Sequence, residues 1–406
     1  MSLLERSTHG SQTLRHRLFP FGWGNITKLA AMYFFATLYF YIPVGTLYLQ
    51  SKDLNYVQIN SLWGIIVGTT FVTEVPTGVI ADRLGRKLSI NIALALQVVG
   101  EAIYIFADSY WPFALAAMMG GLGFAFSSGC VEAFVYDSLK AKWRTVEMSR
   151  AMGFISSAQG LANLLAFTVG GLLVVNLTQE RFVLAIAVTA CAVTVGFLIS
   201  LTLREPQIEL EQAGDDSSLK LLVDGAKTLK SNKVFRRLML LSLATIPFRD
   251  YLLNLYQPYF VEAGVPPIWL GLALALASGI SIFGARYAYR LEACLGTKAS
   301  LLLVTSLPGV LYLVMAAVSH PVFLVLVFCI LRGSMSLKDP IFSGHLNKHI
   351  ESKNRATVLS LISMFSGIYV ALMGLLIGRI GDFSLTYAFV LTGAIVLVES
   401  LVFRLD

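Results

Sequence analysis

The stretch EVPTGVIADRLGRK, from Glu74 to Lys87, decides the fold class of this chain. It begins with a carboxylate inside a long apolar run and ends in a dense group of charges, Asp82, Arg83, Arg86 and Lys87. An ionisable side chain in the middle of a membrane-spanning helix costs roughly 2.5–3.5 kcal/mol on insertion scales. Glu74 therefore needs a partner, a cavity or a function, whereas the charges that follow it need only water.

The composition indicates a membrane protein. The chain has 406 residues, of which 56% are hydrophobic and 14% are charged, whereas roughly a quarter of a soluble domain is charged. Apolar runs recur along the whole length, each long enough to cross a hydrocarbon core of ~30 Å as a helix. Continuous apolarity favours helices over a barrel. The sequence predicts twelve spans, near residues 26–49, 57–80, 88–107, 112–138, 149–175, 181–202, 236–261, 268–289, 299–318, 322–344, 356–378 and 384–403.

One long polar segment divides the chain. Residues 203–235 separate six spans from six more, which predicts an N-terminal six-helix bundle over 1–202 and a C-terminal one over 236–406. The second part of the segment alternates apolar and charged residues at helical spacing, so we expect an amphipathic cytosolic linker at the membrane surface. A disordered tether is the alternative for 206–217.

The distribution of basic residues predicts the orientation. Although the net charge is +7, the basic side chains cluster in the loops on the side of the N-terminus, while the opposite loops hold only Lys52, Arg181 and Arg379. The positive-inside rule then places both termini in the cytoplasm, and an even number of spans agrees. The charge thus gives no reason to expect a nucleic-acid partner.

The sequence gives little support for a metal site or a nucleotide-binding site. The four cysteines lie in apolar runs without metal-type spacing, and His345 and His349 lack a third ligand nearby, so no metal site is predicted. A phosphate-binding GxxxxGK loop is absent. We therefore expect no cofactor, no ATP hydrolysis and no enzymatic activity.

The segment GVIADRLGRK resembles the signature loop of the major facilitator superfamily. Every position of that pattern is filled, by Gly78, Asp82, Arg83, Gly85, Arg86 and Lys87. Gly78 suits a close approach of two helices, Gly85 suits a short turn, and Asp82 could cap the next helix. The segments EVPTG, SSGCVEAFVYDSL, NLYQPYFVEAGVP and RATVLSL are similar to the bacterial, exporter-like branch.

The resemblance implies a fold and a way of working. The fold is an all-α polytopic membrane protein with twelve transmembrane helices in two pseudo-symmetric bundles, and the protein is a monomeric secondary transporter in the cell inner membrane. The chain departs from drug–proton antiporters of the superfamily, because span four lacks an early arginine and span five has Ala166-Phe167 where Gly-Pro is usual. The direction of transport stays open.

In this fold the first helix of each three-helix unit lines the central path, and the unexplained polar residues concentrate in those helices. Asp250, Asn254 and Gln257 share one face of span seven at i, i+4 and i+7. Span four aligns Ser128, Glu132 and Tyr136, and span one aligns Tyr33, Thr37, Tyr41 and Tyr48. By contrast, spans three, six and nine are almost bare of charge, as expected for lipid-facing supports.

Two sets of candidate functional residues follow. The residues expected to bind substrate or couple an ion are Tyr41, Glu74, Glu132, Arg249, Asp250, Asn254, Gln257, Arg332 and Asp339. Static ion pairs of Asp250 and Asp339 with neighbouring cations are the alternative. For Glu74, a protonatable switch and a helix-to-helix hydrogen bond are equally supported. The gating loop comprises Gly78, Asp82, Arg83, Gly85, Arg86 and Lys87, with Asp137 and Arg355 as expected partners; ordinary capping is the alternative.

The sequence thus predicts alternating-access transport of a small organic solute, charged or zwitterionic, by symport or antiport, with proton-coupled export as the first reading. Uptake of an anionic metabolite or of a metal-chelating, siderophore-like organic acid is the second reading, because arginines lie within the spans. A polytopic receptor is the third.

Overall fold

The computed structural model describes residues 21, 24–141, 145–206, 240, 246–342 and 355–403, and this part of the chain is helical with no strand. Most of the predicted linker, the two histidines after span ten and the side chain of Arg355 lie outside the described residues.

The N-terminal bundle follows the predicted spans. Span one consists of α2 (Asn25–Ala36), η1 (Ile42–Val44) and α3 (Gly45–Gln50). Spans two and three are α4 (Tyr56–Leu84) and α5 (Arg86–Phe106), and span four is divided into α6 (Tyr110–Ser127) and α7 (Cys130–Lys140). The short η2 (Thr145–Glu147) leads into α8 (Met148–Leu173), and α9 (Gln179–Leu201) completes the bundle.

The C-terminal bundle begins with α12 (Ile246–Glu262). Next, α13 (Ile268–Ala317) crosses twice, because it is two helices joined at Gly296, where φ is 76°. Span ten is α14 (Pro321–Ser334) with η3 (Met335–Leu337) at its end, and α16 (Arg355–Phe383) and α17 (Leu385–Val402) are the last two spans. Within the described residues these helices account for each of the twelve predicted spans, which confirms the predicted fold class.

Two spans that the sequence predicted as continuous helices are interrupted. Span one leaves helical geometry between Thr37 and Tyr41. Span four breaks at Gly129, whose φ of 66° favours a residue without a Cβ atom. As a result, Ser128 does not share a helical face with Glu132 and Tyr136, and that part of the prediction was wrong.

The two bundles touch at one end of the molecule, which we call the Asp53 end because the connection between spans one and two lies there. The start of α4 packs on the end of α16, where a Cβ atom on Gly378 would lie 2.8 Å from the Val57 Cα. The end of α8 packs on the start of α13 at Gly171 and Gly271, where a Cβ atom on Gly271 would lie 2.7 Å from the Gly171 Cα. Such backbone contacts require glycine.

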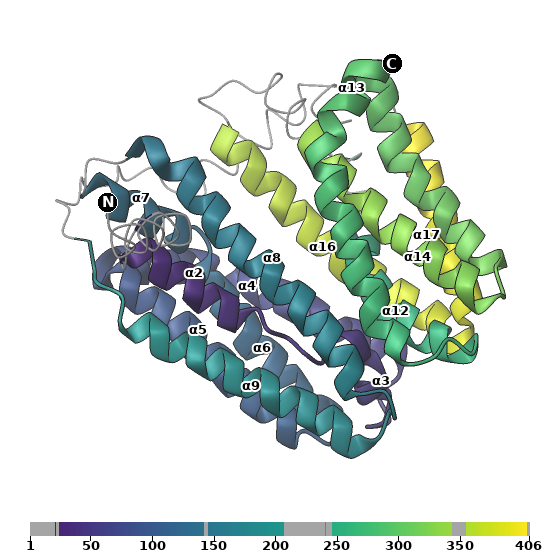
Figure 1. Cartoon of the computed structure of the whole chain (residues 1–406), viewed down its shortest axis with the longest axis horizontal. Coiled ribbons are helices and arrows are strands. Elements are labelled where there is room, and N and C mark those ends of the chain that lie inside the picture. The colour runs from purple at the N-terminus through teal and green to yellow at the C-terminus, as the bar shows by residue number, and fades with distance from the viewer. Residues whose placement is uncertain are drawn as a thin grey trace, which may run out of the picture.

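At the opposite end, the Gly85 end, the bundles diverge. Figure 1 shows the two groups of helices meeting near α3 and separating toward the marked N- and C-terminal ends. On α4 the side chains of Val72 and Val75 are 72% and 59% exposed. Gly78 has no atom within 4 Å of the place where its Cβ would be, so the predicted close helix contact is absent in this state.

Candidate functional site

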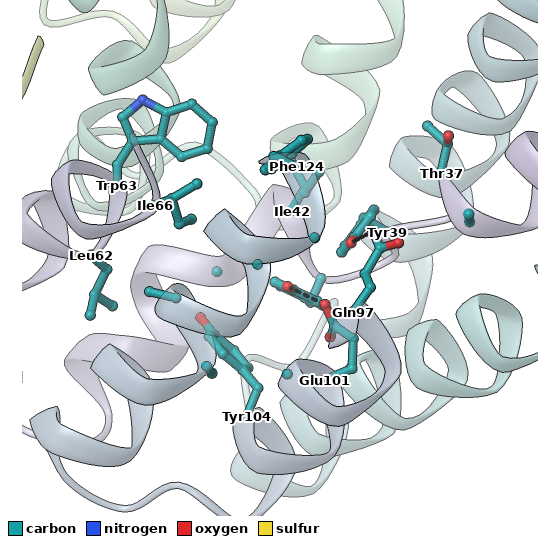
Figure 2. Close-up of a pocket in the computed structure, with 18 of the residues that line it drawn as sticks. Thr37, Tyr39, Ile42, Leu62, Trp63, Ile66, Gln97, Glu101, Tyr104 and Phe124 are labelled. Carbon is teal, nitrogen blue, oxygen red and sulfur yellow. Dashed lines mark hydrogen bonds between the residues drawn. The ribbon is translucent and has the colours of Figure 1, made fainter. Parts of the chain in front are cut away.

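A cavity of about 590 Å³ lies in the N-terminal bundle and is bordered by one face of α12. Its walls come from α2, the interrupted part of span one, α4, α5 and α6. Figure 2 shows Leu62, Trp63 and Ile66 of α4 and Gln97, Glu101 and Tyr104 of α5 in these walls. Sites for small organic ligands are commonly ≈300–1,000 Å³, so this cavity has a suitable size.

The predicted polar face of span seven borders this cavity. Asp250, Asn254 and Gln257 all line it, as their spacing on one helical face predicts. Asn254 Nδ2 donates to Asn60 Oδ1 at 2.9 Å, and Gln257 Oε1 accepts the backbone N–H of Thr46 at 2.8 Å. Two of these three side chains therefore also join the bundles.

The tyrosine face of span one is only partly at the cavity. Tyr33, Thr37 and Tyr41 line it. Tyr48 is fully buried, and its hydroxyl donates to the backbone oxygen of Tyr104 at 3.2 Å. The break after Thr37 separates the faces before and after it, because a helical period cannot be extended through non-helical residues.

Span three contains the residue that sequence reasoning missed. We expected this span to be a lipid-facing support, but Glu101 is 7% exposed and lines the cavity, so that expectation was wrong. Gln97, Glu101 and Tyr104 stand at i, i+4 and i+7 on α5 and all line the cavity. This is the spacing used for span seven, and applying it to every span would have found Glu101.

The charges of spans seven and ten form a second group beside the cavity. Arg249 Nε lies 3.6 Å from Asp250 Oδ1, and Arg249 Nη1 lies 3.5 Å from Asp339 Oδ2. Arg332 is close enough to Asp250 for an electrostatic interaction. Of these four residues only Asp250 lines the cavity. The group thus joins α12 to span ten, and the ion pairs that the sequence offered as the alternative are present.

Glu74 and Glu132 lie outside the cavity lining. Glu74 is exposed, and its Oε1 accepts a hydrogen bond from Ser128 Oγ at 3.3 Å, so α4 is tied to the break in span four. Glu132 is exposed in the first turn of α7, where a negative charge is favourable near the helix N-terminus.

Two acidic residues hold the loop that follows α4. Gly85 has a φ of 97°, so it makes the expected turn. Arg86 forms an ion pair with Asp137 of α7, which places one predicted partner at the loop. The other acid is Glu205, whose Oε1 and Oε2 accept the backbone N–H groups of Arg86 and Lys87 at 2.9 and 2.8 Å. Glu205, rather than Asp82, caps α5, and Asp82 and Arg83 are exposed.

Hydrogen bonds seal the Asp53 end between the bundles. Asp382 Oδ1 accepts the backbone N–H of Tyr56 at 2.6 Å, and Asn60 Nδ2 donates to the backbone oxygen of Gly374 at 3.1 Å. The Tyr256 hydroxyl donates to the backbone oxygen of Pro43 at 3.2 Å. No comparable bond joins the bundles at the Gly85 end among the described residues, in keeping with the gap there.

Comparisons with known proteins agree with this architecture. The chain is 24% identical to the uncharacterized MFS-type transporter YxaM of Bacillus subtilis over 376 residues, which is 89% of this chain and 90% of the relative. It is 22% identical to multidrug resistance protein 2 of the same species, over 88% of each chain.

Solved structures share the fold at low identity. The nucleoside transporter NupG superposes with a TM-score of 0.71 at 15% identity, covering 93% of this chain and 98% of that one. A D-xylose-proton symporter gives 0.66 at 12% identity, covering 93% and 95%. The sequence profile of the Major Facilitator Superfamily matches residues 29–337. This chain is an integral membrane protein that belongs to the major facilitator superfamily.

Proposed function

We propose that the protein is a secondary active transporter that exports a small charged or zwitterionic organic solute in exchange for protons. The observation that carries the proposal is the cavity that the N-terminal bundle forms against α12, in a molecule whose bundles are joined at the Asp53 end and diverge at the Gly85 end. That arrangement is one of the two states that alternating access requires. A transporter of this kind needs neither a cofactor nor a catalytic centre.

The direction of opening follows from the charges. Among the described residues, Arg83, Arg86, Lys87, Lys140 and Arg150 lie at the Gly85 end, whereas Lys52, Arg181 and Arg379 lie near the Asp53 end. With basic loops on the cytoplasmic side, the Gly85 end and both termini face the cytoplasm, and the bundles diverge on the inward side. The setting is the inner membrane of a bacterium, and the working unit is a monomer.

The gating loop gives the second support. In this state Arg86 pairs with Asp137 of α7, and Glu205, three residues past the N-terminal bundle, binds the loop backbone, so neither contact reaches the C-terminal bundle. Asp82 and Arg83 remain exposed toward the gap. In the opposite state the bundles would close here, and these free charges together with the uncovered Gly78 would meet the C-terminal bundle.

Uptake of an anionic metabolite or metal-chelating organic acid is the second candidate. Arg249 and Arg332 favour it, because both lie near Asp250 at the cavity border. A carboxylate that reached past Asp250 could pair with either guanidinium.

Transport into and out of sealed vesicles tests the proposal. Everted membrane vesicles containing the protein are given labelled organic amines, amino acids, organic acids and dyes, with and without an imposed pH gradient. Export predicts accumulation that collapses when the gradient is removed. Accumulation in right-side-out vesicles instead favours uptake. A solute that binds the purified protein and moves in neither kind of vesicle would favour a receptor and contradict transport.

A further inference from the structure

The carboxyl groups at the cavity have no matching cation in its walls. Among the described residues that line it, Glu101 and Asp250 are the acidic side chains, and there is no Lys, Arg or His. The arginines that led us to expect an anion lie beside the cavity and outside its lining. Asp250 is paired with Arg249 beside the cavity, so Glu101 is the carboxyl of the described walls that lacks a cation, and it suits a cationic solute.

Three tyrosine side chains lie near the Glu101 carboxyl: Tyr41 donates a hydrogen bond to it, and Tyr39 and Tyr104 are close enough for an electrostatic interaction. The Tyr41 and Tyr104 rings stack with centroids 5.2 Å apart, and the Tyr39 ring meets Tyr41 edge-on at 5.7 Å. Gln97 donates a hydrogen bond to the Tyr39 hydroxyl, which holds that ring in place. Aromatic faces next to a carboxylate attract ammonium groups through their π-electrons. The rest of the wall is largely apolar and includes Leu94, Phe113 and Phe124.

The hydrogen bonds of Glu101 are incomplete. Its Oε1 accepts from the Tyr41 hydroxyl at 3.2 Å, and its Oε2 is buried without a hydrogen-bond partner. The titratable groups that face it are the hydroxyls of Tyr39, Tyr41 and Tyr104. The other carboxyl of the lining is that of Asp250. A buried carboxyl group with one oxygen unpaired and no cation beside it needs either its own proton or a positive charge supplied from outside.

We propose that Glu101 and the three tyrosines bind the ammonium group of an apolar amine, and that Glu101 exchanges its proton for that group. As the cation enters, the Glu101 O–H bond breaks, the proton leaves to water at the open end, and the carboxylate pairs with the ammonium. On release the carboxyl takes a proton back. The inference rests on the proposed function, because it makes this cavity the transport site.

Binding to the purified full chain in lipid nanodiscs tests the site directly. The probes are 4-phenylbutylamine, 4-phenylbutanol and 4-phenylbutyrate, which share an apolar tail and carry a positive, a neutral and a negative head. We expect the amine to bind at least about tenfold more tightly than the alcohol or the carboxylic acid, because neither analogue can make the charge-assisted contact with Glu101. Equal binding of the three probes would overturn the proposal.

Proton release separates exchange from simple binding. In weakly buffered solution with an indicator dye, saturation with the amine is expected to release about one proton per protein, and the alcohol none. Glu101→Gln should abolish the release and weaken amine binding about tenfold, while Glu101→Asp should restore the release. Glu262→Gln, at the far end of α12, is the control and should behave as wild type.

A measurement on the unmodified protein covers the case in which the variants misfold. Dicyclohexylcarbodiimide adds to protonated carboxyl groups in apolar surroundings, so peptide mass spectrometry should find it on Glu101 and find less when the amine is present. Amine binding with no proton release and no labelling of Glu101 would refute the exchange. If the protein fails these binding tests but still transports another solute, the proposed transport function is retained and only the amine site is rejected.

Discussion

Glu205 binds the loop that begins α5 by accepting the backbone N–H of Arg86 at 2.9 Å, across 119 residues of sequence. The contact joins the end of span six to the turn between spans two and three. A Cβ atom on Gly85 would lie 3.2 Å from the same carboxylate, so the glycine both makes the turn and leaves room for the acid. The superfamily pattern in the loop thus depends on a residue outside it.

Removing the Glu205 carboxylate should destabilise the protein. Glu205→Ala leaves two amides at the start of α5 without their acceptors and is expected to cost about 1–2 kcal/mol, the usual range for a lost helix cap. Glu205→Gln retains one oxygen acceptor and should cost less. Thermal unfolding in detergent measures both, with Asp108→Ala in an exposed loop as the control. A Glu205→Ala protein as stable as the control would show that water replaces the cap without loss.

The pair of Arg86 and Asp137 is expected to be energetically coupled. The two side chains are 27% and 18% exposed, so breaking the pair leaves a partly buried charge alone. Either Asp137→Asn or Arg86→Gln should cost about 1–3 kcal/mol, and the double variant should cost less than the sum of the two. A double-mutant cycle by chemical denaturation measures the coupling. If the cost of the double variant equals the sum of the two single costs, the two side chains are not energetically coupled. Lys140→Gln on the same helix is the control.

Gly271→Ala should disturb the closed Asp53 end. The added methyl group would meet the Phe167 backbone oxygen and would lie 2.7 Å from the Gly171 Cα, so the bundles must separate. Overpacking of this kind costs about 1–3 kcal/mol and is expected to favour the state that is open at the Asp53 end. Gly279→Ala is the matched control on the same helix, because no atom lies within 4 Å of its added Cβ.

Spin labels at Lys52 and Arg379, one on each bundle, report this change by pulsed electron resonance after replacement of the exposed Cys191 and Cys294. The distance distribution should lengthen in the Gly271→Ala protein and stay as in wild type in the Gly279→Ala protein. An unchanged distribution in both would mean that the contact at Gly171 does not govern closure.

Asp250→Asn should strongly reduce transport without preventing folding. The substitution keeps the size of the side chain at the cavity wall and removes the charge that faces Arg249 at 3.6 Å. We expect transport in vesicles to fall by about tenfold or more, with a normal elution profile on gel filtration. Glu262→Gln on the same helix should transport normally. Wild-type rates in the Asp250→Asn protein would remove span seven from the transport site.

Several functional features could be predicted from particular residues. The spacing of Asp250, Asn254 and Gln257 predicted a polar helical face, and the structure places that face at the cavity. The loop pattern predicted a turn at Gly85, and its φ is positive as a turn of this kind requires. Both features depend on residues that are near one another in the chain, where helical period and glycine chemistry act directly.

Other features could not be predicted from the sequence, because they depend on contacts between segments that are far apart in the chain. Glu205 stands in an unremarkable polar stretch after span six, and only the fold brings it to the amides of Arg86 and Lys87. Arg332 looked like part of a path for anions, but it interacts with Asp250 from outside the cavity lining, and the described lining residues include no cation. Span three looked like a lipid-facing support, and only the fold places Tyr41 of span one beside its Glu101.

The sequence by itself determined that the chain spans a membrane as two sets of six helices with a facilitator-type loop, because apolar length, helical period and loop glycines are local properties. Only the tertiary structure decided which polar side chains share a cavity, which acid caps the loop and which end is closed. Those outcomes depend on how helices far apart in the chain pack, and burial of a group such as Glu101 is set by its neighbours in space.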